Sequence, residues 1–143
     1  MTDTIRYPFL TVDHTSGEAG LQPLLPMTLA YGDTTVSCRG LLDTGAMVNV
    51  MPYTIGEQLG ADFDQQAIAL TLTGNLARYE ARALVVSAVI GSFEPVRLVF
   101  AWTKATDVPL LLGQVNFFMA FDVCLYRSRL AFEIGPSAGG SAS

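Results

Sequence analysis

Charged residues are scarce in this sequence. Lys, Arg, Asp and Glu make up 15% of its 143 residues, below the usual share of about a quarter, and they give a net charge of −5 at pH 7. A surface that binds nucleic acid needs clustered Lys and Arg, so this composition argues against a nucleic-acid partner. Sparse charge also leaves apolar residues on the surface, which favours self-association.

Long hydrophobic runs are absent as well. The longest, residues 83–90 with Ser87 inside it, is far shorter than the roughly 18 residues that a membrane-spanning helix needs. The N-terminal residues include Asp3 and contain no apolar segment of the kind found in secretion signals. These features predict a cytoplasmic protein with no membrane partner.

Histidine and cysteine are equally rare. One histidine, His14, and two distant cysteines, Cys38 and Cys124, offer no metal-ligand spacing, so no metal site is predicted. We interpret His14 as a solvated loop residue. The two cysteines are expected to be reduced core residues rather than a disulfide, because the chain has a large apolar core and no secretion signal. No glycine-rich phosphate loop is present, and no cofactor is predicted.

Apolar residues, in contrast, make up 50% of the chain, enough for the core of one domain. We expect a loosely held N-terminal arm at 1–20, a domain at 21–134 and a flexible tail at 135–143, which contains only Gly, Ser, Ala and Pro. Part of the tail, 135–139, matches the G-x-S-x-G pattern of serine hydrolases. That pattern needs a preceding strand, a following helix and a partner histidine, so the match is interpreted as accidental.

Alternating apolar residues predict strands through most of the domain. Leu25, Met27, Leu29 and Tyr31 recur with period two, and a turn at 32–33 leads into a second strand at 35–42. Further strands are expected at 47–51, 67–73, 76–90, 93–102, 110–112, 123–126 and 130–134, and a short one within 5–12. Short helices are expected at 52–60 and 114–121. Many short strands with only two short helices predict an all-β closed or sandwich-like barrel.

The segment 41–46, Leu-Leu-Asp-Thr-Gly-Ala, is the strongest candidate for chemistry. Charge is costly to desolvate, so an acid at Asp43 between two leucines and a Thr-Gly turn indicates a site. Asp-Thr-Gly alone is a weak signal, because an Asx turn between strands has the same sequence. Its context adds weight: a hairpin with a tip at Gly74 follows, and the Leu-Leu-Gly element at 111–113 comes about 70 residues later.

This order of elements resembles the retropepsin family of aspartic proteases, the single-domain relatives of pepsin that work as homodimers. The resemblance covers roughly residues 24–134 and rests mainly on 41–46 and 111–113. It implies an all-β closed barrel with one or two short helices, and an aspartic endopeptidase that acts on a peptide or protein substrate. It implies that the catalytic residues are Asp43, Thr44 and Gly45. It implies that the substrate-binding residues are Ala46, Met47, Thr73, Gly74 and Asn75, the last three at the tip of a flap.

A single motif holds only half of the catalytic group that such an enzyme needs. One carboxylate takes a proton from water while a second, protonated, polarises the scissile carbonyl. The other Asp-Thr pairs, at 3–4 and 33–34, lack the glycine. The second Asp43 must therefore come from a second copy related by a two-fold axis. In the family, the hydroxyl at the position of Thr44 forms a hydrogen bond across that dimer.

The chain departs from the retroviral pattern in three places. Met47 and Gln114 stand where viral enzymes have an acid and an arginine that interact near the dimer interface, so an apolar contact is expected to replace the ion pair. The flap tip has a single glycine, and the chain continues past Tyr126 into a C-terminal hairpin that we expect to build the dimer sheet. Two other functions stay open: a non-catalytic dimeric peptide-binding or scaffold module, and a β-barrel small-molecule binder in which Asp43 merely caps a turn.

Overall fold

The barrel begins with the strand pair that the alternating apolar residues predict. In the computed structural model, which describes residues 3–12 and 20–137, β4 (Leu24–Tyr31) turns at Gly32 into β5 (Thr34–Leu42). The φ angle of Gly32 is +59°, a value that glycine adopts without steric cost. The two strands pair antiparallel along their whole length, and every second side chain of β4 is buried in the core.

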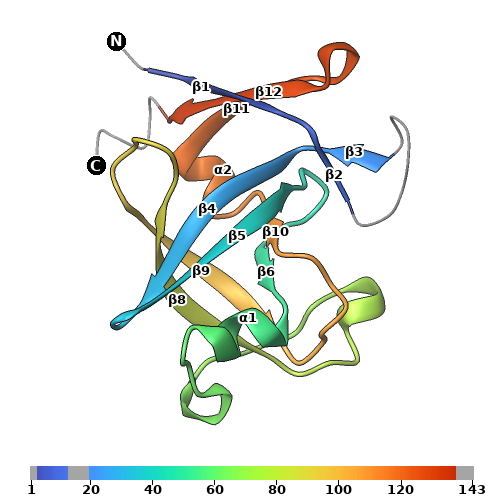
Figure 1. Cartoon of the computed structure of the whole chain (residues 1–143). Helices are drawn as coiled ribbons and strands as arrows, with labels where there is room; N and C mark the ends of the chain where they lie inside the picture. Colours follow the sequence, from blue (N-terminus) through green and yellow to red (C-terminus); the bar gives the residue numbers. More distant parts are fainter. Residues whose placement is uncertain (1–2, 13–19, 138–143) are drawn as a thin grey trace.

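Six strands close the barrel (Figure 1). The remaining four are β6 (Asn49–Met51), β8 (Ala81–Val89), β9 (Val96–Thr103) and β10 (Leu111–Leu112). Around the barrel the order is β4, β5, β10, β6, β9 and β8, and β8 returns to β4. The pairs β5–β10 and β6–β9 are parallel and the others antiparallel. This arrangement confirms the predicted all-β closed barrel.

The first helix covers the bottom of the barrel in Figure 1. α1 (Tyr53–Gln58) follows Pro52 and is ended by Gly60, whose φ is +79°. A Cβ atom on Gly56 would lie 2.1 Å from the indole ring of Trp102, so the helix contacts this buried ring directly through its backbone. The indole Nε1 donates a 3.1 Å hydrogen bond to the carbonyl of Tyr53. The predicted helix at 52–60 is confirmed.

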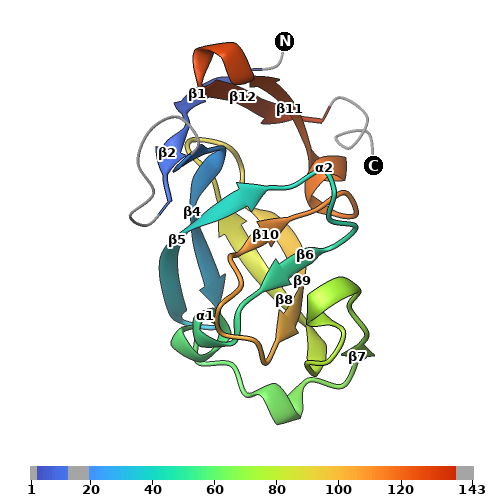
Figure 2. The ribbon, with the colours of Figure 1, turned by 90° about the vertical axis from the view of Figure 1, so that its right-hand side faces the viewer.

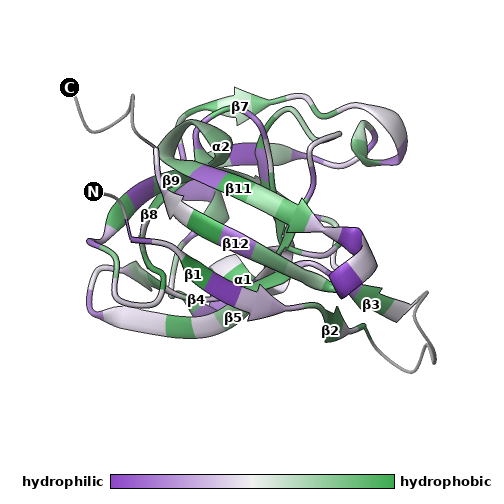
Figure 3. Ribbon diagram, turned by 90° about the horizontal axis from the view of Figure 1, so that it is seen from above, coloured by the Kyte–Doolittle hydropathy of each residue, from purple (hydrophilic) through white to green (hydrophobic). Residues whose placement is uncertain are grey.

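A separate three-stranded sheet lies above the barrel in Figure 1 and faces the viewer in Figure 3, which looks down on it. β12 (Ala131–Pro136) is its central strand, with β1 (Ile5–Pro8) on one side and β11 (Phe121–Tyr126) on the other. A small pair, β2 (Leu10–Thr11) with β3 (Leu21–Gln22), leads into the barrel. β11 is an edge strand, so its outer backbone groups are open to another strand.

The sheet corrects two expectations about the ends of the chain. Residues 5–8 are not loosely held, because they pair with β12 through four residues, and Arg6 adds a 3.0 Å ion pair with Glu133. The C-terminal strand continues through Gly135 and Pro136, which pair with β11, so the expected tail does not begin at 135. His14 lies outside the described residues. The proposed domain boundaries stay a prediction.

Three segments differ from the predicted elements for identifiable reasons. The helix expected at 114–121 is only α2 (Phe117–Ala120), because Asn116 has a positive φ of 79° that no helix accepts. The strand expected at 67–73 is only β7 (Ala69–Leu70), and the chain then makes the short 3₁₀ turn η3 (Gly74–Leu76) before β8. β6 begins at Asn49 rather than 47, since the preceding residues form a loop. Two other 3₁₀ turns are η2 (Phe63–Gln65) and η4 (Arg127–Arg129).

The two cysteines are free and lie on different sheets. Cys38 on β5 is half-buried, whereas Cys124 on β11 is exposed, so the expectation of a core position is wrong for Cys124. Within the described part of the chain, none of the helices combines the length and the apolar character required to cross a membrane.

Candidate active site

Asp43 follows directly on the last residue of β5, beside β10. The two strands lie side by side in Figure 2 and run parallel, with Leu41 opposite Leu111 and Leu42 opposite Leu112. The backbone N–H of Asp43 donates a 3.1 Å hydrogen bond to the carbonyl of Leu112, which continues the pairing one step further. Leu42 is buried and Asp43 is half-buried. The carboxylate is therefore placed where the buried strand leaves the barrel.

The Thr-Gly turn fixes one oxygen of this carboxylate. Oδ1 of Asp43 accepts a 2.9 Å hydrogen bond from the backbone N–H of Gly45, and the carbonyl of Asp43 accepts a 3.1 Å hydrogen bond from Ala46. A Cβ atom on Gly45 would lie 3.2 Å from Oδ1, closer than most side chains allow. No donor from the described residues reaches the second oxygen, Oδ2. The turn thus orients the carboxylate and leaves one oxygen available.

The Leu-Leu-Gly element holds the loop from the other side. Backbone N–H groups of Gln114 and Val115 donate to the carbonyls of Ala46 and Met47, at 2.9 and 2.8 Å. A Cβ atom on Gly113 would lie 2.5 Å from the carbonyl oxygen of Val48, so only glycine permits this approach. The loop that carries Asp43 is therefore held in position by hydrogen bonds and close packing against residues 112–115.

The side chain of Gln114 adds a further hydrogen bond to this loop, from Nε2 to the carbonyl of Thr44. Gln114 and Met47 are the two positions where an ion pair of the viral type is missing. Here an uncharged amide contacts the loop that carries Asp43 directly. Thr44 and Gly45 are both exposed, and the structure places them on the same turn as Asp43.

Sequence reasoning missed the role of Asn49. This side chain is fully buried, and its Oδ1 accepts a 2.8 Å hydrogen bond from the N–H of Gly113. Its Nδ2 donates to the carbonyl of Val99 and to Oδ1 of Asn116, each at 3.0 Å. The signal was present in the sequence, because Asn49 is the single polar interruption of the apolar run at 47–51.

A cavity of about 300 Å³ lies beside the loop that carries Asp43. Its lining contains no charged residue and consists of Gly45, Ala46, Met47, Val48, Val50, Thr71, Leu72, Thr73, Leu76 and Leu111. Three of the predicted substrate-binding residues, Ala46, Met47 and Thr73, line it. The other two, Gly74 and Asn75, lie in the adjacent turn η3 but not in the lining.

Exposed apolar side chains border the same loop. Met47 is 67% exposed, Val115 48% and Met119 65%. The hydrogen bond from Val115 to the carbonyl of Met47 places the first two side by side, and Met119 lies on α2, one turn further. Figure 2 shows α2 next to the loop between β5 and β6. We call Met47, Val115 and Met119 the apolar patch.

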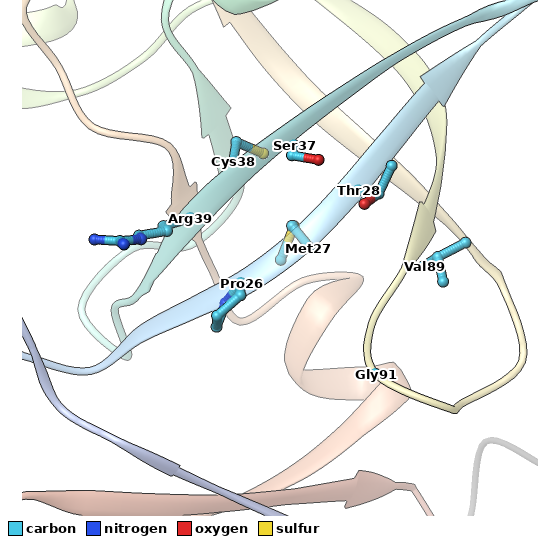
Figure 4. A pocket seen from close by; sticks show the side chains of 8 residues that line it. All are labelled: Pro26, Met27, Thr28, Ser37, Cys38, Arg39, Val89 and Gly91. Atoms are coloured by element: carbon cyan, nitrogen blue, oxygen red, sulfur yellow. The ribbon is translucent and has the colours of Figure 1, made fainter.

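A larger and more open hollow of about 440 Å³ lies elsewhere, on the outside of β4 and β5 (Figure 4). Cys38 contributes to its lining, and burial raises the pKa of the Cys38 thiol to about 11, so it is a protonated thiol near neutral pH. Arg39 extends away from the hollow in Figure 4. No carboxylate lines it. Unlike the loop that carries Asp43, this hollow therefore offers no carboxylate for acid–base chemistry.

No group of three or more His, Cys, Asp or Glu residues that could hold a metal ion is found among residues 3–12 and 20–137.

Comparison with known proteins connects this geometry to a family. A family profile described as aspartyl protease matches residues 27–115, which include both the Asp43 loop and the Leu-Leu-Gly element. A search of curated protein sequences found no match.

Comparison with solved structures identifies the fold. The chain is similar to a retropepsin-like aspartic protease from Rickettsia conorii, with a TM-score of 0.60 and 15% identity over 95% of this chain and 94% of that one. It is also similar to the EIAV protease complexed with the inhibitor HBY-793, with a TM-score of 0.46 and 18% identity over 73% of this chain and 88% of that one. The first likeness establishes the retropepsin-like fold predicted from the sequence.

Proposed function

This chain belongs to the aspartyl protease family and is an aspartic-type endopeptidase of retropepsin-like fold, and from that premise we propose that it works as a homodimer in which each copy supplies one Asp43. The observation that carries this proposal is the state of the Asp43 carboxylate. Oδ1 is held by the N–H of Gly45, Oδ2 has no partner among the described residues, and an uncharged cavity adjoins the loop.

The proposed chemistry needs two carboxylates with different protonation. Two carboxylates brought together cannot both ionise easily, so they share one proton. The ionised Asp43 takes a proton from water, and the water oxygen attacks the carbonyl carbon of the peptide while the protonated Asp43 donates to the carbonyl oxygen. When the tetrahedral intermediate collapses, the first Asp43 gives the proton it took from water to the amide nitrogen, the C–N bond breaks, and the second Asp43 recovers a proton from a hydroxyl of the intermediate. The pair is then ready for another water.

The dimer contact is proposed to include the apolar patch. The patch residues Met47, Val115 and Met119 are exposed in one chain and carry no charge. They lie beside the Asp43 loop, which must approach the same loop of the second chain. Copies that each have a net charge of −5 repel one another in general, so an uncharged contact surface is the one at which they can approach. Thr44 is proposed to donate a hydrogen bond across the two-fold axis, and the free edge of β11 to extend the dimer sheet.

The substrate is proposed to lie along the uncharged cavity. Its apolar lining favours substrates that place an apolar side chain next to the scissile bond. One wall is formed by Thr71, Leu72, Thr73 and Leu76. We assign Thr73 and the adjacent Gly74 and Asn75 to a flap that offers backbone groups to an extended peptide. Ala46 and Met47 form the opposite side. A cytoplasmic location stays a prediction of the sequence.

The test uses an unstructured protein as substrate. Wild-type chain should cleave it, with acid-favoured activity that pepstatin blocks, whereas Asp43→Asn, which keeps the shape but cannot exchange a proton, should not. A non-catalytic peptide-binding module would bind the substrate without cleaving it in either form. A small-molecule binder would sediment as a monomer. Wild-type cleavage rates in Asp43→Asn would exclude the proposed role of this residue.

A further inference from the structure

Asn116 has a backbone conformation that a residue with a side chain rarely adopts. Its φ is 79° and its ψ is −66°, and the N–H of Phe117 donates a 3.1 Å hydrogen bond to the carbonyl of Val115. These features define a tight three-residue γ-turn of the strained kind. Among the non-glycine residues that the structure describes, only Leu130 also has a positive φ. Glycine would adopt this conformation more easily, so the asparagine side chain must offset the strain.

The Asn116 side chain is held by three hydrogen bonds. Its Oδ1 accepts from the backbone N–H of Val99 at 2.9 Å and from Nδ2 of Asn49 at 3.0 Å. Its Nδ2 donates to the carbonyl of Arg97 at 3.3 Å. Arg97 and Val99 belong to β9, a strand of the closed barrel. The strained turn is thus fastened to a rigid element.

The same contacts lead from β9 to the catalytic loop. Asn49 links Asn116 to Gly113. Its Nδ2 donates a hydrogen bond to Asn116, and its Oδ1 accepts a 2.8 Å hydrogen bond from the N–H of Gly113. The two residues after Gly113, Gln114 and Val115, donate to the carbonyls of the loop at 2.9 and 2.8 Å. Asn116 therefore sets the position of the short segment on which the Asp43 loop is built, although it does not touch Asp43 itself.

We propose that Asn116 is a positioning residue for catalysis. It acts through Asn49 and the 113–115 segment to hold the Asp43 loop in the position where it meets the Asp43 loop of the second chain. This inference rests on the proposed homodimeric function. An active site needs its groups held to within a fraction of an ångström by surrounding contacts, and a displacement of about 1 Å can lower a rate by roughly a hundredfold. The backbone strain at Asn116 is the energetic cost of holding the Asp43 loop this precisely.

Two substitutions at Asn116 separate positioning from folding. Asn116→Gly relieves the backbone strain and removes all three side-chain hydrogen bonds. Asn116→Asp keeps oxygen acceptors for Val99 and Asn49 but replaces the donor to Arg97 with an oxygen that faces the Arg97 carbonyl. We expect kcat to fall about tenfold to a hundredfold in the glycine variant, with KM nearly unchanged, and to recover in part in the aspartate variant. Both are assayed well below the unfolding midpoint, at concentrations where sedimentation shows the dimer.

Leu130→Gly is the matched control. Leu130 is the other residue with a positive φ, 51°, and it lies at the turn between β11 and β12. Its substitution relieves similar backbone strain without removing a side chain that is fastened to β9. We expect the kcat of Leu130→Gly to equal that of the wild type, whatever happens to its unfolding midpoint.

Amide hydrogen exchange gives a readout that does not depend on activity. In Asn116→Gly the amides of Asp43, Gln114 and Val115 should exchange at least about tenfold faster, while the β8–β9 ladder keeps its protection. Wild-type kcat in folded Asn116→Gly, or unchanged exchange at these amides, would overturn the proposal. A wild-type chain that cleaves no peptide would overturn the proposed function instead, and the exchange result would then decide the positioning role alone.

Discussion

The side chain of Gln114 donates a hydrogen bond to the main-chain carbonyl of Thr44, a residue 70 positions earlier in the sequence. This contact is neutral, whereas the retroviral pattern has an ion pair near this place. A retroviral-type ion pair would use Gln114 and Met47, and this chain has a charge at neither position. The catalytic loop is instead held by amide groups, from the side chain of Gln114 and from the backbone of 114–115. Its geometry should therefore depend little on salt.

Substitution of Gln114 by Glu tests this neutral contact. Glutamate has the same shape but no donor, and its charge would face the carbonyl oxygen of Thr44. We expect kcat to fall about tenfold, while the free energy of unfolding changes by less than about 1 kcal/mol because the side chain is exposed. The matched control is Gln66→Glu, which removes a 3.0 Å hydrogen bond of the same type to the carbonyl of Asp62, away from the loop. Equal kcat in both variants would contradict the assignment.

The apolar patch gives a prediction about assembly. Met47→Glu places a charge opposite its own copy, and burying an unpaired charge is strongly unfavourable. We expect this variant to sediment as a monomer and to lose activity. Val85→Glu is the control, because Val85 is also apolar and 45% exposed but lies on the outer face of β8. A Met47→Glu chain that stays dimeric at wild-type concentrations would show that the two copies meet elsewhere.

The Cys38 thiol gives a prediction about pH. Burial raises its pKa from an ordinary value of 9.0 to about 11, so the folded chain holds this proton more tightly than the unfolded chain. The resulting stability is fully present below about pH 9 and is lost as the pH rises toward 11. Cys38→Ala should flatten this part of the stability curve measured by urea unfolding.

Alkylation checks the same point independently. The thiolate is the reactive form, so a protonated, half-buried Cys38 should react slowly with iodoacetamide at about pH 8, whereas the exposed Cys124 is accessible to the reagent. Rapid labelling of Cys38 in the folded chain would contradict the described burial.

Much of the fold could be predicted because local patterns and tertiary structure agree in those segments. The period-two leucines of β4 and the Gly32 turn correctly predicted the first strand pair, and the apolar run before Gly113 correctly predicted the strand β10. Pro52 and Gly60 correctly bounded α1. In each of these segments, one buried face or one backbone angle limits which residues can occur, so the local sequence is enough to predict the element.

The remaining features depend on contacts between residues that are far apart in sequence. Asn116 shortens the second helix because its side chain is fastened to β9, and nothing in the sequence around 114–121 indicates that partner. The 67–73 strand is reduced to 69–70, where Leu70 pairs with Ala81 of β8, and Leu72 beyond it packs in a cluster with Val50 beside the cavity. The cavity beside Asp43 likewise draws its lining from three parts of the chain that are far apart in sequence, within 45–50, within 71–76 and at Leu111.

The central claim is that each active site contains one Asp43 from each of two chains. A subunit-mixing titration tests it most directly: wild-type chain is held at a fixed concentration above the dimer dissociation constant, and Asp43→Asn chain is added until the subunits have exchanged. Activity per wild-type chain should fall in proportion to the wild-type fraction of all chains, because a mixed dimer has a single carboxylate. Activity per wild-type chain that stays constant throughout the titration would contradict the claim.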